Sequence, residues 1–284
     1  MMDNQTVMTG VFGYPVGQSM SPDMHNAAFQ TLGLNYAYAA FPIAPGQLQE
    51  AVSGIRALGF KGVNVTIPHK VEIMHYLDEI DDEAREIGAV NTVVNRDGVL
   101  IGYNTDGQGF VRSLLEETQV NVAGKRVLIL GAGGAARAVA VSLARNGAKQ
   151  ISIANRSQDK AIELAGQVRI HTDAEAIRLD QVDVQLLKSI DLLVNTTSIG
   201  MYPAIDGMPI SSEALHSGLL VSDLIYNPLE TRLLREARQI GASTHNGVGM
   251  FIHQGALSFQ LWTGYDAPLD VMRRTVLERL RNKT

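Results

Sequence analysis

The sequence predicts an α/β protein of two domains, and three observations carry this prediction. Short apolar runs alternate with amphipathic stretches along most of the chain, which is typical of a mainly parallel sheet covered by helices. A glycine-rich turn follows one of these apolar runs near the middle of the chain, at residues 131–136. The length of 284 residues is about twice the roughly 150 residues of a typical domain.

The first half of the chain begins with a predicted strand at 7–12, and a loop rich in Gly, Pro and Ser leads from it into a helix at 22–32. Ser21 is expected to cap this helix through its hydroxyl, because Pro22 suits the first helical position. The alternation continues with strands at 36–42 and 62–65, helices at 45–58 and 69–76, a hairpin turn at 95–98 and a strand that ends at 103.

The second half repeats the alternation after a predicted helix at 106–117 and a polar connector at 118–124, which favours a domain boundary near this point. It predicts strands at 126–130, 151–154, 192–195, 219–223 and 242–245, with helices that end near 145, 168 and 240. The residues after 249 predict two helices without a strand, so they should pack on a domain already formed. We expect an N-terminal α/β domain of residues 1–105 plus 250–284, a Rossmann-like domain of residues 106–249, and a cleft between them.

Composition excludes several classes of protein and partner. Lys and Arg number 24 against 29 Asp and Glu, a net charge of −5, and no long basic run offers a grip on nucleic acid. With no cysteine there is no disulfide, no thiolate nucleophile and no zinc site built on thiolates, which fits a reducing compartment such as the cytoplasm. The first residues lack a secretory signal, and no apolar run approaches the ~20 residues of a membrane helix. We expect a soluble cytoplasmic protein with no membrane or nucleic-acid partner.

The glycine-rich turn is the sharpest local signal. Residues 127–130 form a buried strand that runs directly into G-x-G-x-x-A at Gly131, Gly133 and Ala136, where a helix begins. Gly131 permits the tight turn, Gly133 lets a pyrophosphate approach the backbone, and Ala136 keeps the helix close to the sheet. A purely structural turn is the alternative, but the place between strand and helix, with a second strand about 20 residues on, favours dinucleotide binding.

The end of that second strand indicates which nicotinamide cofactor is preferred. An NAD-binding unit usually carries an acidic residue here for the ribose hydroxyls, and this chain has none. Asn155 can still hydrogen-bond the ribose, while Arg156, Ser157 and Lys160 offer a planar fork, a hydroxyl and a charge to a 2′-phosphate. The hypothesis is NADP; the alternative is a helix cap at Ser157 beside a solvated arginine.

Three polar stretches of the first half lie where α/β proteins hold their ligands. Ser19 and Ser21 share one loop at a helix start, where a carboxylate can be held by hydroxyls and backbone N–H groups, although either residue alone could be only a cap. Thr66 and Lys70 follow a buried strand, but a single lysine there is more often a solvated helix residue. Asp106 taken alone is most simply a helix N-cap.

The motifs in combination resemble the shikimate dehydrogenase family, whose members reduce 3-dehydroshikimate with NADPH in aromatic amino-acid biosynthesis. The similarity covers essentially the whole chain. The matching motifs, in order, are SxSP with His25-Asn26, NVTIPHK (64–70), GAVNT (88–92), NTDGxG (104–109), GAGGAARA (131–138), NRS (155–157), NTTSxGM (195–201), DLIYNPLET (223–231), and NGVGM with QGAxxFxxWTG (246–264).

The resemblance implies a role for individual residues and for each domain. Lys70 and Asp106 are implied as the catalytic pair, in a first domain that binds substrate. Ser19 and Ser21 are implied at the substrate carboxylate, and the residues implied around the ring hydroxyls and carbonyl are Thr66, Asn91, Asp106, Tyr226 and Gln254. Those implied in the NADP-binding second domain are Gly131, Ala132, Gly133, Gly134 and Ala135 at the pyrophosphate, Asn155, Arg156, Ser157 and Lys160 at the adenosine phosphate, and Thr196, Leu224, Gly247 and Met250 at the nicotinamide.

Two positions depart from the commonest family pattern, and neither removes an implied catalytic group. Gln18 stands where the family usually has histidine, and Ser157 where threonine is usual. No metal is required, since the seven histidines show no HExxH spacing. The alternatives are a quinate/shikimate dehydrogenase that also uses NAD, disfavoured by Arg156 and the missing acidic residue, and a non-enzymatic metabolite sensor, disfavoured by Lys70 and Asp106. The sequence leaves both a monomer and a homodimer possible.

Overall fold

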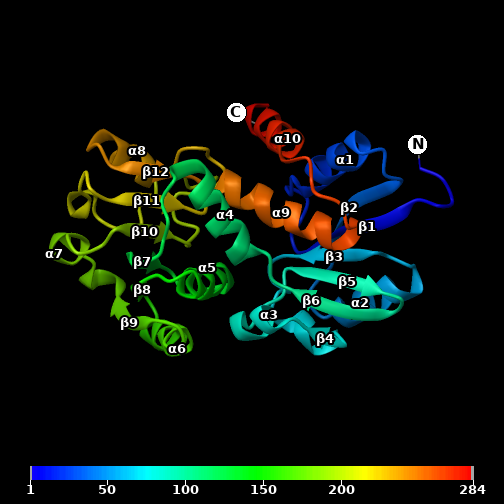
Figure 1. Cartoon of the computed structure of the whole chain (residues 1–284), viewed down its shortest axis with the longest axis horizontal. Coiled ribbons are helices and arrows are strands. Elements are labelled where there is room, and N and C mark those ends of the chain that lie inside the picture. The colour runs from blue at the N-terminus through cyan, green and yellow to red at the C-terminus, as the bar shows by residue number, and fades with distance from the viewer. Residues whose placement is uncertain (1, 283–284) are drawn as a thin grey trace. The chain divides into compact units, whose positions relative to one another are not determined.

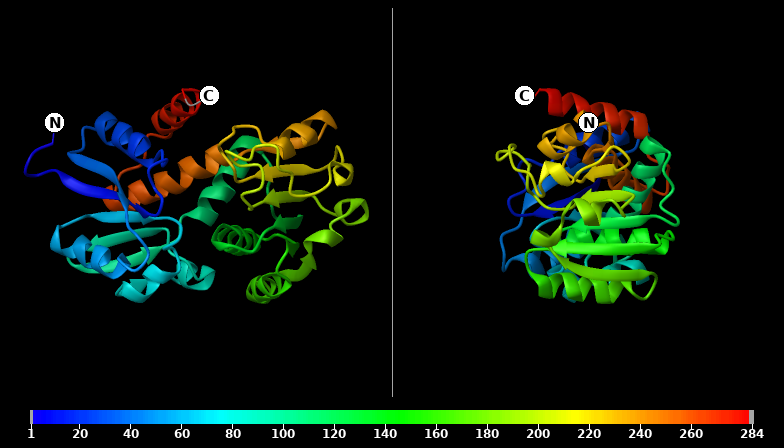
Figure 2. Two further views of the ribbon diagram at one scale, coloured as in Figure 1. Left: turned by 180° about the vertical axis from the view of Figure 1, so that it is seen from behind. Right: turned by 90° about the vertical axis from the view of Figure 1, so that its left-hand side faces the viewer.

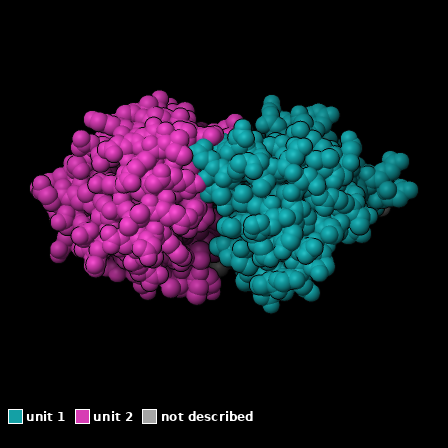
Figure 3. All heavy atoms as spheres, turned by 90° about the horizontal axis from the view of Figure 1, so that it is seen from below, with its two compact units in different colours: residues 1–106, 252–284 teal, residues 107–251 magenta. Residues whose placement is uncertain are grey.

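The computed structural model describes residues 2–282, and the chain divides into two compact units. The first unit comprises Met1–Asp106 and Ile252–Thr284, and the second Gly107–Phe251. Figure 3 shows the two units in different colours, and each contains one six-stranded sheet (Figure 1). Among the described residues, no helix combines the length and the apolar character needed to cross a membrane.

The sheet of the first unit is mixed and has the strand order β2-β1-β3-β5-β6-β4. Its strands are β1 (Val7–Gly13), β2 (Tyr36–Pro42), β3 (Gly62–Val65), β4 (Glu79–Ile80), β5 (Thr92–Arg96) and β6 (Val99–Tyr103). Strand β1 pairs parallel with β2 and β3, whereas β5 is antiparallel to both β3 and β6. The end of β3, the start of β5 and the end of β6 therefore lie together along one edge of the sheet. This edge is formed by the ends of the strands and not by an outermost strand.

Helices pack on both faces of this sheet because successive strand residues point to opposite sides. One face packs on α2 (Leu48–Ala57), the 3₁₀ helix η1 (Glu72–Tyr76) and α3 (Asp82–Ile87) through an apolar cluster that includes Val63 and Val93. The other face carries α1 (Ser21–Thr31) and the part of α9 (Gly247–Thr263) that belongs to this unit, and α10 (Leu269–Arg281) packs on α1 (Figure 1). There the ring of His25 stacks on that of Tyr38, with ring centroids 4.5 Å apart.

Strands β5 and β6 are joined by a two-residue hairpin turn at Asp97 and Gly98. Both residues have positive φ, 53° and 94°, as a type I′ turn requires, and Asp-Gly is a preferred sequence for it. Asn95 Oδ1 accepts a hydrogen bond from the Gly98 amide at 2.8 Å. The turn thereby sets the pairing of the two strands, in which Thr92 lies opposite Tyr103.

The sheet of the second unit is entirely parallel, with the order β12-β11-β10-β7-β8-β9 that is typical of a dinucleotide-binding fold. Its strands are β7 (Arg126–Leu130), β8 (Gln150–Asn155), β9 (Asp173–Arg178), β10 (Leu192–Asn195), β11 (Leu220–Asp223) and β12 (Ser243–His245). A sheet of this kind is covered on both faces, so its strands are nearly continuous apolar runs.

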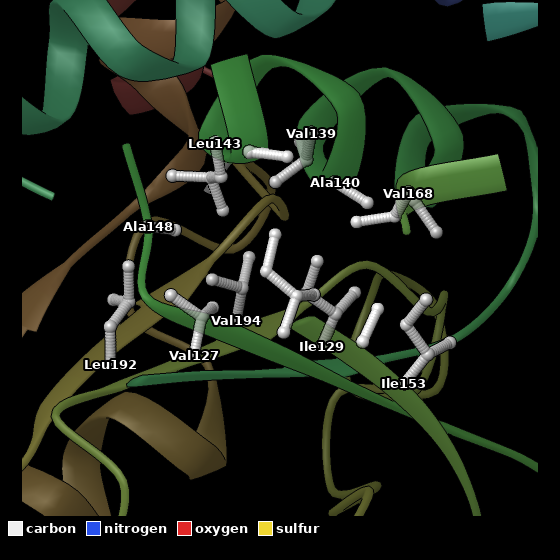
Figure 4. Close-up of a cluster of buried hydrophobic side chains, with 14 of the residues drawn as sticks. Val127, Ile129, Val139, Ala140, Leu143, Ala148, Ile153, Val168, Leu192 and Val194 are labelled. Atoms are coloured by element: carbon white, nitrogen blue, oxygen red, sulfur yellow. The ribbon is translucent and has the colours of Figure 1, made fainter. Parts of the chain in front are cut away.

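Alternate residues of β7 enter two separate cores. Val127 and Ile129 face α4 (Asp106–Thr118), α5 (Gly134–Arg145) and α6 (Gln158–Val168), and Figure 4 shows their side chains directed at those of α5. Leu128 and Leu130 face α7 (Val184–Leu187), the 3₁₀ helix η3 (Ser212–Ala214) and α8 (Arg232–Gln239). Figure 2 shows the helices of this unit on both sides of its sheet. The 3₁₀ helix η2 (Leu179–Gln181) follows β9.

The α/β class and most of the predicted elements are confirmed, and the strands at 36–42, 62–65, 126–130 and 192–195 have the predicted bounds. The predicted helix at 69–76 is wrong in type and start, because the chain makes a turn there and only Glu72–Tyr76 is helical, as a 3₁₀ helix. Ser21 is the first residue of α1 and not its cap; the N-cap is Met20, with no side-chain capping bond. Strands β4 and β9 and helix α3 were not predicted.

Substitution of Gly62 by alanine should destabilise the first unit. Trp262 is 2% exposed and its Nε1 donates to the carbonyl of Val93 at 3.0 Å; a Cβ on Gly62 would collide with both groups. We expect a loss of about 1–3 kcal/mol in the free energy of unfolding, measured by urea denaturation. In the matched control Gly54→Ala, the new Cβ of α2 meets nothing within 4 Å, so stability should be kept or raised by up to about 1 kcal/mol. Equal stability of the two variants would contradict this packing.

Candidate functional site

Three polar segments of the first unit come together at the sheet edge where β3 and β6 end and β5 begins. Thr66 and Lys70 follow β3, Asn91 immediately precedes β5, and Asp106 follows β6. The antiparallel insertion of β5 is what brings its N-terminal end to the carboxyl ends of its neighbours. This edge is a usual place for ligands in α/β sheets.

The Lys70 ammonium and the Asp106 carboxylate form an ion pair at the centre of this edge. Lys70 Nζ lies 2.6 Å from Asp106 Oδ2, and the two side chains are 22% and 9% exposed. The other carboxylate oxygen, Oδ1, accepts from Asn91 Nδ2 at 2.8 Å. Because both oxygens are engaged, the carboxylate is held in one orientation while the lysine keeps partial access to solvent. The aspartate is thus more than a helix start.

Asn91 is itself fixed by a buried network. Its Oδ1 accepts from the Thr105 amide at 2.8 Å and from the Thr92 hydroxyl at 2.9 Å. Its Nδ2 also donates to Thr105 Oγ1 at 2.9 Å, and that hydroxyl donates to the carbonyl of Gln254 in α9 at 3.0 Å. The side chains of Lys70, Asn91 and Asp106 therefore belong to one connected cluster, which the backbone carbonyl of Gln254 joins.

Behind this cluster lies a second set of buried polar groups that the sequence analysis did not identify. Asn64 Nδ2 donates to Thr92 Oγ1 and to Ser258 Oγ, at 3.1 and 2.9 Å, and Asn64 Oδ1 accepts from the Tyr38 hydroxyl at 2.8 Å. The available signal was an amide in the apolar strand Gly62–Val65, where a buried polar residue needs partners. Its partner in α9 is 194 residues away in the chain, so the sequence alone could not show the pairing.

Ser19 and Ser21 lie at the start of α1. The Ser21 amide donates to Ser19 Oγ at 3.2 Å, so the two hydroxyl-bearing residues are held together where α1 begins. The N-terminus of α1 adds the positive end of the helix dipole, a setting that suits a carboxylate. Asp23 in that first turn is half-exposed, and Arg279 Nε lies 3.2 Å from its carboxylate, which reduces the repulsion it would exert on an anion.

The glycine turn of the second unit fits a pyrophosphate. Gly131 has a φ of 110°, a backbone conformation that residues with a side chain rarely adopt. A Cβ at this position would also collide with Thr196 Oγ1. A Cβ on Gly133 would meet no atom within 4 Å, so the space beside this backbone is open. Ala136 is fully buried. The first turn of α5 carries no acidic residue, so its unpaired amides present a positive end to an anion. Ala132, Gly134 and Ala135 complete this turn.

The loop after β8 has the basic character predicted for it. Asn155 Nδ2 donates to the carbonyl of Ser157 at 2.9 Å and shapes the turn. Arg156, Ser157 and Lys160 are exposed. Ser157 is the N-cap of α6 but makes no side-chain capping bond, so capping does not account for its hydroxyl. No carboxylate follows this strand until Asp159.

The residues expected at the nicotinamide gather at the carboxyl ends of β10, β11 and β12. Thr196 Oγ1 donates to the carbonyl of Leu130 at 2.7 Å, and the Gly247 amide donates to that of Ile225 at 3.1 Å. A Cβ on Gly247 would collide with the Leu224 carbonyl, so this close approach needs glycine. Met250 packs in the apolar cluster of this unit.

Tyr226 also belongs to the second unit, where its ring lies 4.9 Å from that of Phe251. Burial raises the pKa of the Tyr226 hydroxyl above its ordinary value, so at neutral pH the group stays protonated and can donate a hydrogen bond. The hydrogen-bonded cluster around Lys70, in contrast, is confined to the first unit.

A buried aspartate ties the loops after β10 and β11 together. Asp223 is fully buried; its Oδ1 accepts from Asn195 Nδ2 at 3.0 Å and its Oδ2 from the Thr231 hydroxyl at 2.7 Å. Asn195 Oδ1 accepts in turn from the Thr197 hydroxyl at 2.8 Å. No role was predicted for Asp223. Burial raises the pKa of this carboxyl from 3.8 to about 6, although its hydrogen bonds oppose the shift.

This raised pKa predicts a pH-dependent difference between the wild type and Asp223→Asn. The folded state holds the Asp223 proton more tightly than the unfolded state, so the stabilisation is full below about pH 4 and is lost as the pH rises through about 6. Relative to the asparagine variant, the wild type should lose up to about 3 kcal/mol of unfolding free energy over that range. Urea denaturation at pH 4.5, 5.5 and 7 measures it, with Asp206→Asn as a control at an exposed aspartate. A constant difference at all three pH values would contradict the prediction.

Comparison with known proteins shows similarity along nearly the whole chain. Family models described as shikimate dehydrogenase substrate binding domain, shikimate/quinate 5-dehydrogenase and shikimate 5′-dehydrogenase C-terminal domain match residues 11–93, 113–205 and 247–277. A shikimate dehydrogenase (NADP(+)) of Geobacillus sp. (strain WCH70) is 51% identical, over 95% of this chain and 98% of that protein.

Solved structures agree with the sequence relatives. A shikimate dehydrogenase in complex with NADP+ is 46% identical with a TM-score of 0.93, covering 99% of this chain and 98% of that one. The shikimate 5-dehydrogenase of Thermus thermophilus, in complex with NADP(H) and shikimate, is 36% identical with a TM-score of 0.87, over 96% of this chain and 99% of that one.

Proposed function

This chain belongs to the shikimate dehydrogenase family, and we propose that it catalyses the reversible, NADP-dependent reduction of 3-dehydroshikimate to shikimate in aromatic amino-acid biosynthesis. The observation that carries the proposal is the Lys70–Asp106 ion pair of 2.6 Å, held from behind by Asn91. The curated relatives named for NADP(+) and the neighbours solved with NADP support the same cofactor.

We assign substrate binding to the first unit. The substrate carries a carboxylate, which suits the two hydroxyls and the helix start at Ser19 and Ser21. Thr66, Asn91 and Gln254 offer hydroxyl and amide groups to the ring oxygens, and we assign the Tyr226 hydroxyl to the same oxygens. Support comes from the hydrogen bonds that Asn91 donates to Asp106 and to Thr105, whose hydroxyl donates in turn to the backbone carbonyl of Gln254.

The chemistry of carbonyl reduction matches the pair at the sheet edge. The chemistry that bound NADPH would supply here is a hydride for the carbonyl carbon C3. Lys70 Nζ gives the developing alkoxide both a nearby positive charge and a proton, so the carbonyl becomes a hydroxyl. Asp106 orients the ammonium, and in the reverse direction Lys70 accepts the hydroxyl proton.

We assign NADP binding to the second unit. Gly131–Ala135 would hold the pyrophosphate at the start of α5, and the residues from Asn155 to Lys160 would hold the adenosine phosphate. Thr196, Leu224, Gly247 and Met250 would face the nicotinamide. The open space beside the backbone of Gly133 and the exposed side chain of Arg156 support this assignment.

We place the enzyme in the cytoplasm as a monomer or homodimer with a small-molecule substrate and no nucleic-acid or membrane partner. The absence of cysteine and the slightly acidic charge balance support this placement.

The proposal is tested by a spectrophotometric assay at 340 nm with shikimate and quinate, each against NADP and NAD. We expect the highest kcat/KM with shikimate and NADP, because the loop after β8 is basic and lacks a carboxylate for the ribose hydroxyls. Comparable rates with quinate and NAD would instead indicate the broader quinate/shikimate activity. Tight binding of shikimate without turnover would indicate a sensor.

Substitution of Lys70 by alanine should lower kcat by about 10²–10⁴-fold while KM changes little, since the proton and charge it supplies act mainly in the transition state. Steady-state kinetics in both directions measure the two constants. Lys61→Ala is the matched control, because Lys61 precedes β3 at the opposite edge of the same sheet, and its activity should equal that of the wild type. A Lys70 variant that loses only affinity would make Lys70 a binding residue and not a catalyst.

A further inference from the structure

A hollow beside the loop after β8 is lined by two arginines, and one of them, Arg178, has no role in the cofactor assignment. It measures about 400 Å³ and is lined by Arg156, Arg178, Leu179, Asp180 and Pro209. Strands β8 and β9 are parallel neighbours, with Asn155 paired to Arg178. The two arginines therefore come from adjacent strand ends at the carboxyl edge of the sheet, the edge that also carries the glycine turn.

Arg178 is held by an acid that a phosphate could replace. Its Nε and Nη2 donate to the two carboxylate oxygens of Asp180 at 3.0 and 2.6 Å. The two side chains are 58% and 63% exposed, and an ion pair so exposed adds little to stability. The same planar fork fits two oxygens of a phosphate as well as those of a carboxylate.

The charge around the hollow favours a dianion over a neutral ribose. Hydrogen bonding from Arg178 lowers the pKa of the Asp180 carboxyl, so this group is ionised at neutral pH and occupies the guanidinium. Arg156 makes no ion pair with any residue that the structure describes. Its guanidinium is therefore available to an anionic ligand, whereas that of Arg178 is occupied by Asp180. Leu179 and Pro209 add an apolar wall to the same hollow, of the kind that an aromatic base contacts.

We propose that Arg178 binds the 2′-phosphate of NADP(H) together with Arg156, and that Asp180 competes with this phosphate for Arg178. The inference rests on the proposed use of NADP and names a specificity residue outside the loop after β8. A phosphate monoester carries up to two negative charges at neutral pH, so it displaces the singly charged Asp180 from the guanidinium. NAD has no such group, and its binding does not draw on Arg178.

The test is the dissociation constant of NADPH and of NADH for the full-length protein, measured by calorimetry without turnover. In Arg178→Ala we expect NADPH to bind about tenfold more weakly, with less than about a twofold change for NADH. In Asp180→Asn we expect NADPH to bind about threefold more tightly, because the competing charge is gone. Adenosine 2′,5′-bisphosphate and adenosine 5′-phosphate are the matched probes of the 2′-phosphate alone, and only the first should follow the same pattern.

Arg238→Ala is the control variant, because Arg238 forms a comparable exposed pair with Glu230 at 2.7 Å away from the hollow; both constants should match the wild type. An equal loss for NADPH and NADH in Arg178→Ala, or no loss for either, overturns the role of Arg178. Weaker NADPH binding in Asp180→Asn overturns competition and shows that Asp180 positions the guanidinium.

Failure of the role proposed for Arg178 can be distinguished from failure of the proposed reaction. If the wild type oxidises shikimate with NADP while Arg178→Ala binds NADPH normally, only the role of Arg178 fails. If the wild type shows no turnover with any substrate pair, the proposed reaction fails whatever the binding constants are.

Discussion

The chemistry at the edge of the first sheet depends on one hydrogen bond, from Asn91 Nδ2 to Asp106 Oδ1 at 2.8 Å. A carboxylate bound by a lysine alone could rotate with that flexible side chain. Because Asn91 holds the other oxygen, and because Asn91 is itself bound by Thr105 and Thr92, the carboxylate is fixed and the lysine is the member of the pair that keeps access to solvent. The cost of burying these polar groups is offset by the bonds among them.

The second unit solves a comparable problem with the same means. Its loops after β10 and β11 are held by a carboxylate that accepts from both, Asp223. In each unit a buried side chain orients the groups that would contact a ligand. Such residues show little in a sequence, since their role is defined by partners from distant segments.

Sequence patterns predicted the fold where burial is complete. The strands at 62–65 and 126–130 are fully or almost fully buried, so their apolar runs were clear, and the glycine turn was clear because its conformation demands glycine. Strand β9 was missed since its sequence, DAEAIR, alternates charged and small residues at an exposed sheet edge. That omission concealed Arg178, which ends the strand. The Asn64 partners were hidden for another reason, namely that Ser258 lies in a distant helix.

The hairpin turn at Asp97 and Gly98 has a consequence for groups it never touches. Strand β5 runs towards this turn and β6 runs away from it, so the start of β5 and the end of β6 lie side by side at the far end of the hairpin. Asn91 immediately precedes β5, and Asp106 follows β6. A shift of one residue in the turn would move every side chain of one strand to the other face of the sheet. The pairing of the two strands therefore fixes the positions of Asn91 and Asp106. A two-residue loop in this way sets the spacing at which an amide and a carboxylate meet.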